Sequence, residues 1–305
     1  FIEPEWEGSK QIYLNGFSTS LPKETQIKAL KTIPAFQNIE LIRPGYAIEY
    51  DYLIPSQLKR SLESKSIKGL FSAGQINGTS GYEEAASQGL IAGINSVNYL
   101  QSRKPLILSR NEAYIGVLID DLTTKDINEP YRMFTASAEY RLLLRPDTAH
   151  QRLFKHAKKH KTLNPEQTKT VTRFLDDLKS NLAKINKNKQ KPGSTFNKIL
   201  RNETSYIKLT NHPDFCKSTK ESIFSAETQI KYEGYIKREE ERLAKTKTME
   251  EKLIKSSFRF SSVPNLSNEA REKLEKLKPE TLGQASRIAG VKPSDVASIA
   301  IALSR

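Results

Sequence analysis

The protein has 305 residues, 37% of them hydrophobic and 28% charged, a balance that suits a chain long enough to bury the cores of two domains. No run of 18 or more apolar residues occurs, which argues against a membrane span. The single cysteine excludes both an internal disulfide and a thiolate metal cage, and so few cysteines are typical of a protein in a reducing compartment such as the cytoplasm. The net charge of +14 predicts a polyanionic partner, of which nucleic acid is the commonest.

Residues 1–102 contain glycine-rich and β-branched segments that predict a sheet followed by one helix. The chain begins at Phe1 rather than at a methionine, so we expect its first residues to lie inside a domain. Extended segments are expected at 39–43, 46–52 and 69–74, with a turn at Pro44 and Gly45 between the first two.

Residues 70–100 predict a strand, a glycine-rich loop over 73–82 and a helix. We expect one face of this helix to carry its apolar and small residues, namely Ala85, Ala86, Gly89, Leu90, Gly93, Ile94, Val97 and Leu100. Gly89 and Gly93 would let the helix lie close to a sheet or another backbone. Free amides and the positive end of a helix converge at such a loop and favour an electron-rich ligand. A plain strand–turn–helix connection is the alternative, because no GxGxxG pattern occurs anywhere in the chain.

Residues 103–152 form a connecting segment of short apolar runs with charged residues between them. Asp120 and Asp121 could be an acid/base pair, but neighbours on a strand point to opposite faces, so a role in supporting the fold is favoured. A domain change is expected near residue 150.

The chain then becomes helical and strongly basic. Residues 151–200 hold 11 lysines and two arginines against one glutamate and two aspartates. This basic block either binds phosphates or is a solvated, lysine-rich face. Further helices are expected at 227–246, from a Ser267 cap to Leu277, at 281–289 before a Gly290 C-cap, and from Pro293 to Leu303.

Two further patterns have alternative interpretations. His156 and His160 share a helical face and could begin a metal site, but lysines surround them, so a basic solvated face is favoured and no metal is expected. Residues 281–299 resemble a helix–turn–helix with Ser286 before the turn. The second helix of this pattern has no arginine, asparagine or glutamine to contact bases, so packing within the domain or against a protein is favoured.

Several long motifs closely resemble the MnmG (GidA) family in that family's order: Gly69–Ala86 (GLFSAGQINGTSGYEEAA), Arg43–Asp51, Tyr114–Leu122, Glu129–Thr135, Lys231–Ile236 and Gly283–Val291. The resemblance covers nearly the whole chain but only about the second half of a family member. Two departures stand out, because Ser137 replaces a family arginine and Thr148-Ala149-His150 replaces Asn-Ala-Asp. Cys216 lies outside any family motif, so no catalytic role is carried over to it.

The resemblance implies an α/β part of an FAD-binding flavoprotein with two dinucleotide-binding domains, followed by an all-α domain. Residues 1–102 would complete the FAD-binding domain, 103–152 would connect, and 153–305 would bind tRNA or a partner. The whole enzyme would add a carboxymethylaminomethyl group at C5 of the tRNA wobble uridine, with FAD, NADH as reductant and methylene-tetrahydrofolate as one-carbon donor. It would work as a cytoplasmic homodimer with the GTPase MnmE.

The resemblance also implies site residues. Cofactor-binding candidates are Gln75, Gly74, Asn77, Gly78, Thr79 and Glu83. Candidates for tRNA phosphate are Arg132, Arg141 and Arg145, and structural salt bridges are an equal alternative for each. The basic block itself adds Lys158, Lys159 and Lys161 as candidates for tRNA phosphate. No catalytic residue is assigned. We expect the 305 residues alone to be inactive. The alternatives are another two-domain flavin oxidoreductase, or a stand-alone module that binds tRNA or a partner.

Overall fold

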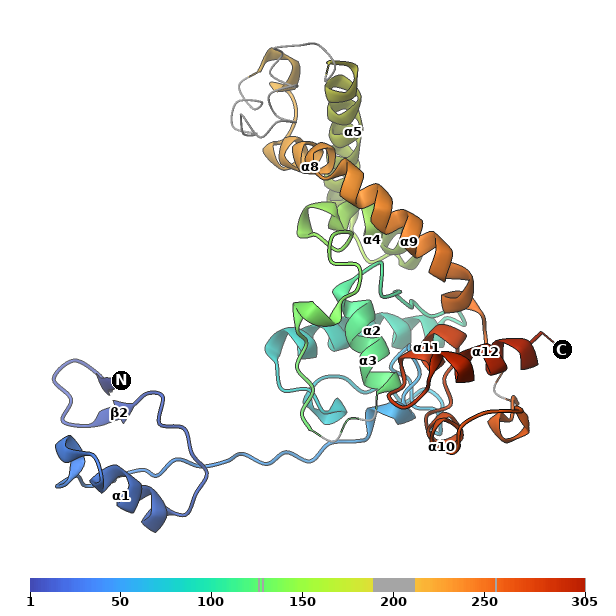
Figure 1. The fold of residues 1–305 in the computed structure, drawn as a ribbon. Helices are drawn as coiled ribbons and strands as arrows, with labels where there is room; N and C mark the ends of the chain where they lie inside the picture. The colour runs from blue at the N-terminus through green and yellow to red at the C-terminus, as the bar shows by residue number, and fades with distance from the viewer. Residues whose placement is uncertain (126, 128, 189–211, 256, 305) are drawn as a thin grey trace. The chain divides into compact units, whose positions relative to one another are not determined.

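A computed structural model describes residues 1–125, 127, 129–188, 212–255 and 257–304 of the protein (Figure 1). The chain divides into two compact units, Phe1–Asp51 and Tyr52–Arg305. These units are defined by contacts, and the domain boundaries expected near residues 102 and 152 stay a prediction. None of the described helices is both long and apolar enough for a membrane span.

The first unit combines a hairpin with one helix. Strands β1 (Ile2–Pro4) and β2 (Ile12–Leu14) pair antiparallel, and α1 (Lys23–Lys31) follows directly after Pro22. The buried side chain of Gln26 on α1 bonds both the amide and the carbonyl of Gly45, at 2.8 Å each. This contact attaches the segment after α1 to the helix.

The strands expected at 39–43 and 46–52 are wrong, because these residues have no strand conformation. The expected strand at 69–74 is reduced to one bridge, between Glu63 and Phe71. A strand exists only where a neighbour pairs with its backbone, and within the described residues β1 and β2 are the only strands that pair in a sheet.

The expected helix after the glycine loop is confirmed as α2 (Tyr82–Leu100), but its orientation differs from the prediction. The side chains of α2 that are buried are mostly polar: Glu84, Gln88, Ile91, Ala92, Asn95 and Asn98. The small and apolar face is largely exposed, and a Cβ at Gly89 or Gly93 would meet nothing within 4 Å. The close approach expected at these two glycines is therefore not made within the described chain.

Hydrogen bonds explain why the polar face of α2 is buried. Asn95 donates to the carbonyls of Ser61 and Leu106 at 3.0 Å and accepts from the Leu106 amide at 2.6 Å. Asn98 pairs with the Nδ1 atom of His160 at 3.0 Å. A buried amide that completes the hydrogen bonds of nearby backbone is stable, whereas an apolar residue there would leave that backbone unsatisfied.

The segment 103–152 contains α3 (Tyr114–Thr124), which is almost entirely buried. It packs against α2 and against the helix α11 (Leu282–Arg287). The short turn η5 (Pro146–Thr148) then leads directly into α4 (Ala149–His160).

A pair of packed helices and a further long helix come after α4. Helices α5 (Pro165–Asn188) and α8 (Lys220–Lys231) pack side by side through Phe174, Leu178, Ile223 and their neighbours. The helix expected at 227–246 is instead two helices, because α8 ends at Lys231 and α9 (Glu233–Glu251) begins after Tyr232, which flanks both.

The last helices form a separate core with Ile254 and Phe260. They are α10 (Asn268–Leu277), α11 and α12 (Pro293–Ala302). Ser267 caps α10 by accepting from the Ala270 amide, as the sequence predicted, and α12 begins at Pro293. Helix α11 ends two residues before the predicted Ala289, with Ile288 as its C-cap, so the C-cap expected at Gly290 is wrong. Gly290 has a φ of 92°.

Candidate functional site

The glycine loop between residues 73 and 82 has a defined, internally bonded conformation. Gly74 and Gly78 have φ values of 88° and 75°, which residues with a side chain rarely adopt. The amides of Gly74, Asn77 and Gly78 donate to Gln88 Oε1, Gly74 O and Gln75 O respectively. The backbone amides of these three cofactor-binding candidates thus already donate hydrogen bonds within the chain.

Gln88 on α2 organises this loop, and no sequence motif pointed to it. Its Oε1 accepts from Asn77 Nδ2 at 2.8 Å, and its Nε2 donates to Thr79 Oγ1 at 2.9 Å. Asn77 also donates to the Ser72 carbonyl. All three of Asn77, Thr79 and Gln88 are buried, so the side chains of Asn77 and Thr79 shape the loop in this chain.

Two predicted cofactor residues keep exposed side chains, Gln75 in the loop and Glu83 in the first turn of α2. Helix α2 begins after Gly81, which has no side chain to cap the first amides. The positive end of the helix dipole is therefore free of a side-chain cap, and a Cβ at Gly74, the neighbour of Gln75, would lie 3.5 Å from Ala85 in the first turns of α2. An electron-rich group fits this end of the loop.

Glu84 is a second residue that sequence reasoning missed. It is only 4% exposed, and its Oε1 accepts from the Met133 amide at 3.0 Å and lies 3.6 Å from Arg132 Nε. Its Oε2 has no hydrogen-bond partner among the described residues. A Cβ at Gly81 would collide with this carboxylate, so Gly81 provides room for Glu84. The segment that contains Arg132 is thereby held against the start of α2.

The three arginine candidates for tRNA phosphate differ in their surroundings. Arg132 and Arg141 are exposed. Arg145 is largely buried, pairs with Asp147 at 2.9 Å and donates to the Leu142 carbonyl at 2.8 Å. A structural salt bridge therefore describes Arg145 in this fold, whereas Arg132 and Arg141 can reach a ligand.

The three lysine candidates lie at the C-terminal end of α4, and all are exposed. Lys158 Nζ lies 4.4 Å from the centre of the Phe154 ring, and Lys161 ends the helix with a φ of 55°. Cations are stabilised at this negative end of a helix whether or not a phosphate is bound. Residues 189–200 of the basic block lie outside the described residues.

His156 and His160 have different partners, so they do not converge on one ion. His156 Nε2 lies 2.9 Å from Glu112 Oε1, and His160 pairs with Asn98. Glu112 also accepts from Lys155 at 2.8 Å and from the Ser109 amide at 3.1 Å. Burial raises the pKa of Glu112, but these donors outweigh burial and hold the pKa at about 2. Among the described residues no group of three potential metal ligands forms.

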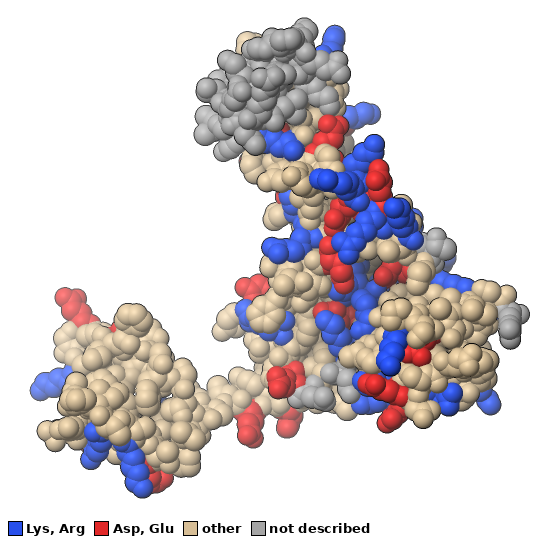
Figure 2. Space-filling view, viewed as in Figure 1, with Lys and Arg blue, Asp and Glu red and all other residues tan. Residues whose placement is uncertain are grey.

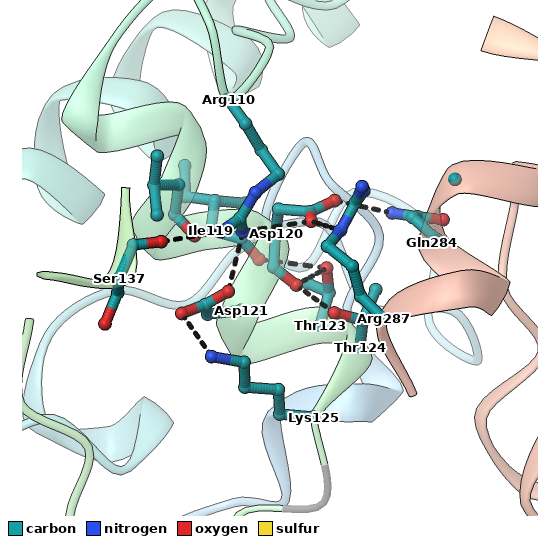
Figure 3. Close-up of polar contacts among 12 residues, drawn as sticks. Arg110, Ile119, Asp120, Asp121, Thr123, Thr124, Lys125, Ser137, Gln284 and Arg287 are labelled. Atoms are coloured by element: carbon teal, nitrogen blue, oxygen red, sulfur yellow. Dashed lines mark hydrogen bonds and ion pairs between the residues drawn. The ribbon is translucent and has the colours of Figure 1, made fainter. Parts of the chain in front are cut away.

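Asp120 and Asp121 were expected on a strand, with their side chains on opposite faces, and this expectation is wrong. Both lie on α3 and both contact Arg110, whose Nη1 is 3.2 Å from Asp120 Oδ2 and 2.6 Å from Asp121 Oδ1 (Figure 3). Arg110 also pairs with Glu139 and donates to the Ser137 carbonyl. Consecutive residues of a helix are about 100° apart, which lets one guanidinium reach both carboxylates.

Figure 3 also shows α11 joined to α3 through Asp120. Arg287 Nε lies 2.9 Å from Asp120 Oδ2, and Gln284 Nε2 donates to Asp120 Oδ1 at 3.1 Å. Arg287 also contacts Glu250 at the end of α9, at 2.7 Å. Burial alone would raise the pKa of Asp120, but Arg287, Arg60 and Arg110 keep it below its ordinary value. These two carboxylates support the fold, as the sequence favoured.

The second helix of the helix–turn–helix pattern, α12, packs against the other C-terminal helices. Val296 and Ile299 on α12 are buried in the core that α10 and α11 share. Asp295 accepts from the Ser267 amide at 2.9 Å, so the polar start of α12 is also bonded within the domain. Packing within the domain is confirmed.

Ser137 and His150, which depart from the family motifs, each contact a residue nearby. The Ser137 carbonyl accepts from Arg110 at 3.0 Å, a bond that does not depend on the side chain. The ring of His150 packs edge-on against Phe174, with centroids 4.9 Å apart.

Comparison with known proteins places these features in one family. Three family models match: "Glucose inhibited division protein A" at residues 1–104, "tRNA modifying enzyme MnmG/GidA C-terminal helical domain" at 151–240, and "tRNA modifying enzyme MnmG/GidA C-terminal helical bundle" at 242–305. The chain belongs to the MnmG/GidA family.

Relatives and solved structures agree with this assignment. The chain is 47% identical over 311 residues to the tRNA uridine 5-carboxymethylaminomethyl modification enzyme MnmG of Protochlamydia amoebophila, covering 100% of this chain and 50% of that protein. The MnmG of Bacteroides fragilis is 47% identical over 326 residues, covering 97% and 52%. The form II crystal structure of Aquifex aeolicus GidA matches with a TM-score of 0.78 and 40% identity, covering 100% of this chain and 52% of that one. The chain thus spans about half the length of these relatives.

Proposed function

We propose that this chain is the C-terminal half of an FAD-dependent enzyme that adds the 5-carboxymethylaminomethyl group to the wobble uridine of tRNA. The observation that carries the proposal is the match along the whole chain, at 47% identity, to proteins named for this modification. That match favours an enzyme over a stand-alone binding module.

The residues at the glycine loop fit an FAD site of which this chain supplies one side. Gln75 would contact the cofactor through its exposed side chain, and the uncapped start of α2 follows the same loop. When bound, FAD would supply the redox chemistry, with NADH as reductant and methylene-tetrahydrofolate as one-carbon donor. The helix end favours negative charge on the cofactor by roughly 0.3 to 1 kcal/mol. Because the loop amides are bonded internally, the contribution of this chain rests on Gln75 and the first turn of α2.

The basic surfaces fit a tRNA partner. Arg132 and Arg141 are exposed, and Lys158, Lys159 and Lys161 are exposed at the C-terminal end of α4. We include the GTPase MnmE, a homodimeric assembly and a cytoplasmic location in the proposal.

Flavin absorbance tests this proposal. We expect the purified 305-residue chain to be colourless and the full-length polypeptide that contains it to carry FAD. In the full-length protein, Gln75→Ala should weaken FAD binding by about 1 to 3 kcal/mol if a buried hydrogen bond is lost. Gln101→Ala, at the far and exposed end of α2, is the matched control. A stoichiometric flavin band in the 305-residue chain alone, or none in the full-length protein, would contradict the divided site.

A further inference from the structure

Tyr131, in the segment after α3, joins the glycine loop to a buried carboxylate. Its amide donates to the Gly78 carbonyl at 2.7 Å, and its backbone pairs with Thr79 in a parallel bridge. Its hydroxyl donates to Asp121 Oδ2 on α3 at 2.8 Å. This half-buried residue thus holds the loop with its backbone and α3 with its side chain.

The hydroxyl of Tyr131 has a strong and a weak acceptor within reach. Met133 Sδ lies 3.3 Å from it, but a thioether accepts weakly, whereas the carboxylate of Asp121 accepts strongly. Burial and the charge of Asp121 raise the pKa of Tyr131, so the hydroxyl keeps its proton at neutral pH. Tyr131 is therefore fixed at both ends, at its backbone by the loop and at its hydroxyl by Asp121.

Asp121 belongs to the buried network that continues to α11 (Figure 3). Arg110 Nη1 lies 2.6 Å from Asp121 Oδ1 and 3.2 Å from Asp120 Oδ2, so the two carboxylates share one guanidinium. Arg287 of α11 contacts the same Asp120 oxygen, with its Nε at 2.9 Å. Charges interact more strongly when buried than in water, so a change at one member of such a network alters the contacts of the others.

We propose that Tyr131 is a positioning residue that holds the glycine loop in the conformation that binds the cofactor, and that α11 sets this hold through the buried network. The inference rests on the proposed function and deepens it, because it adds a regulation of the cofactor site by the C-terminal helices. Without Arg287, Asp120 draws Arg110 more strongly, and Asp121 keeps less of that cation. The partner of the Tyr131 hydroxyl is then less firmly placed, so a displacement of α11 loosens the loop.

Tyr131→Phe in the full-length polypeptide tests the hold on the loop, because it removes the hydroxyl and keeps the ring and the backbone. We expect FAD binding to weaken about tenfold, the effect of losing one hydrogen bond to a charged group. We also expect the flavin reduction potential to become more negative, because a loosened loop holds the positive end of α2 less firmly toward the negative charge of reduced flavin. In the flavin-free protein, the amide of residue 131, which donates to Gly78, should exchange its hydrogen faster.

Tyr140→Phe is the matched control. Tyr140 is also buried, and its hydroxyl lies 3.2 Å from Thr246 Oγ1 on α9, outside the contacts of the loop. Its loss should leave the FAD affinity, the reduction potential and the exchange at residue 131 unchanged.

Arg287→Lys tests the link to α11, because it keeps a cation but loses the planar guanidinium that reaches Asp120 and Glu250 together. We expect weaker FAD binding from this variant alone, and little further weakening when it is added to Tyr131→Phe, since both changes break one chain of contacts. Gln284→Ala, which removes the neutral donor from α11 to Asp120, is the second variant for this link and should act in the same direction.

The outcomes separate this inference from the proposed function. Equal FAD affinity, potential and exchange in Tyr131→Phe and the unmodified protein overturn the positioning role and leave the proposed function intact. Additive effects of Tyr131→Phe with each α11 variant overturn the link to α11. Folded, unmodified full-length protein that binds no flavin contradicts the proposed function, whereas hydrogen exchange at residue 131 needs no flavin and still decides whether the Tyr131 hydroxyl holds the loop.

Discussion

Asp120 and Asp121 are neighbours on α3, and both are buried with their charges paired by arginines. Asp120 accepts from Arg110, which precedes α3, and from Gln284 and Arg287, which both lie on α11. Without the Asp120 charge, Arg110 keeps Asp121 and Glu139, and Arg287 keeps Glu250, but both guanidiniums lose a buried carboxylate. The cost of breaking one pair in a buried group exceeds the net value of the pair itself.

We therefore expect Asp120→Asn to lower the free energy of unfolding by about 3 to 5 kcal/mol, the cost of breaking a buried ion pair. Denaturant unfolding of the 305-residue chain measures this. Glu269→Gln, which removes the partner of Lys273 in an exposed pair, is the matched control and should cost much less, because solvent screens an exposed pair. A value for Asp120→Asn no larger than that of the control would show that the buried network adds little.

The lowered pKa of Glu112 predicts that the stability of the folded chain depends on pH. Its pKa in the folded protein is about 2, below the ordinary value of 4.5. A depressed pKa contributes stability that is complete above the ordinary value and is lost as the pH falls toward 2. We expect Glu112→Gln to reduce the loss of stability between pH 5 and about 2, as measured by unfolding at several pH values. An identical pH profile in the variant would contradict the pairing with Lys155 and His156.

At the scale of elements, α2 shows how far the sequence determined the fold. Its apolar pattern correctly predicted a helix after the glycine loop but assigned the wrong face to the interior. The pattern could not show that Gln88, Asn95 and Asn98 would each find buried backbone or side-chain partners, because those partners lie outside the helix. Local signals did better elsewhere, since Ser267 and Pro293 act through adjacent residues and their helices begin as predicted.

The candidate site, like the fold of α2, could be predicted from the sequence only in part. The motif around Gln75 identified the loop, but the roles of Glu84 and Gln88 depend on how α2 meets the loop and the residues after α3. Likewise, Asp120 and Asp121 were assigned to the fold for the wrong reason, because their shared partner Arg110 is visible only in three dimensions.

The two faces of α2 give a prediction at this scale. In the 305-residue chain, Gln88→Leu should lower the free energy of unfolding by about 1 to 3 kcal/mol, because it leaves polar groups of Gly74, Asn77 and Thr79 unsatisfied. Leu90→Ala on the exposed face should change it by at most about 0.5 kcal/mol. The reverse order of the two effects would show that the apolar face of α2 is the buried one.

At the scale of the whole molecule, positive charge is in excess but is not uniform. Figure 2 shows Lys and Arg mixed with Asp and Glu along α9, and this helix is not a purely basic surface. Helix α4 differs, since its last turn is basic and continues into Lys161. If tRNA phosphates bind the chain, α4 is the better candidate.

Charge reversal at Lys158, Lys159 and Lys161 tests this location in the full-length polypeptide. Each duplex phosphate contact contributes up to about 0.9 to the slope of log K against log salt, so we expect the slope for tRNA to flatten by about 2 to 3. Reversal of Lys23, Lys28 and Lys31 on α1 is the control for net charge alone. Equal slopes in the first variant and the unmodified protein would mark the α4 lysines as a solvated face.

The central claim is that this chain completes an enzyme that modifies tRNA uridine. The most direct test expresses the full-length polypeptide in a bacterial strain that lacks its own family member, followed by mass spectrometry of the nucleosides from total tRNA. We predict that 5-carboxymethylaminomethyluridine or its derivatives return, and that they do not return when the polypeptide lacks residues 1–305. Folded, flavin-loaded full-length protein that restores none of these nucleosides would contradict the account.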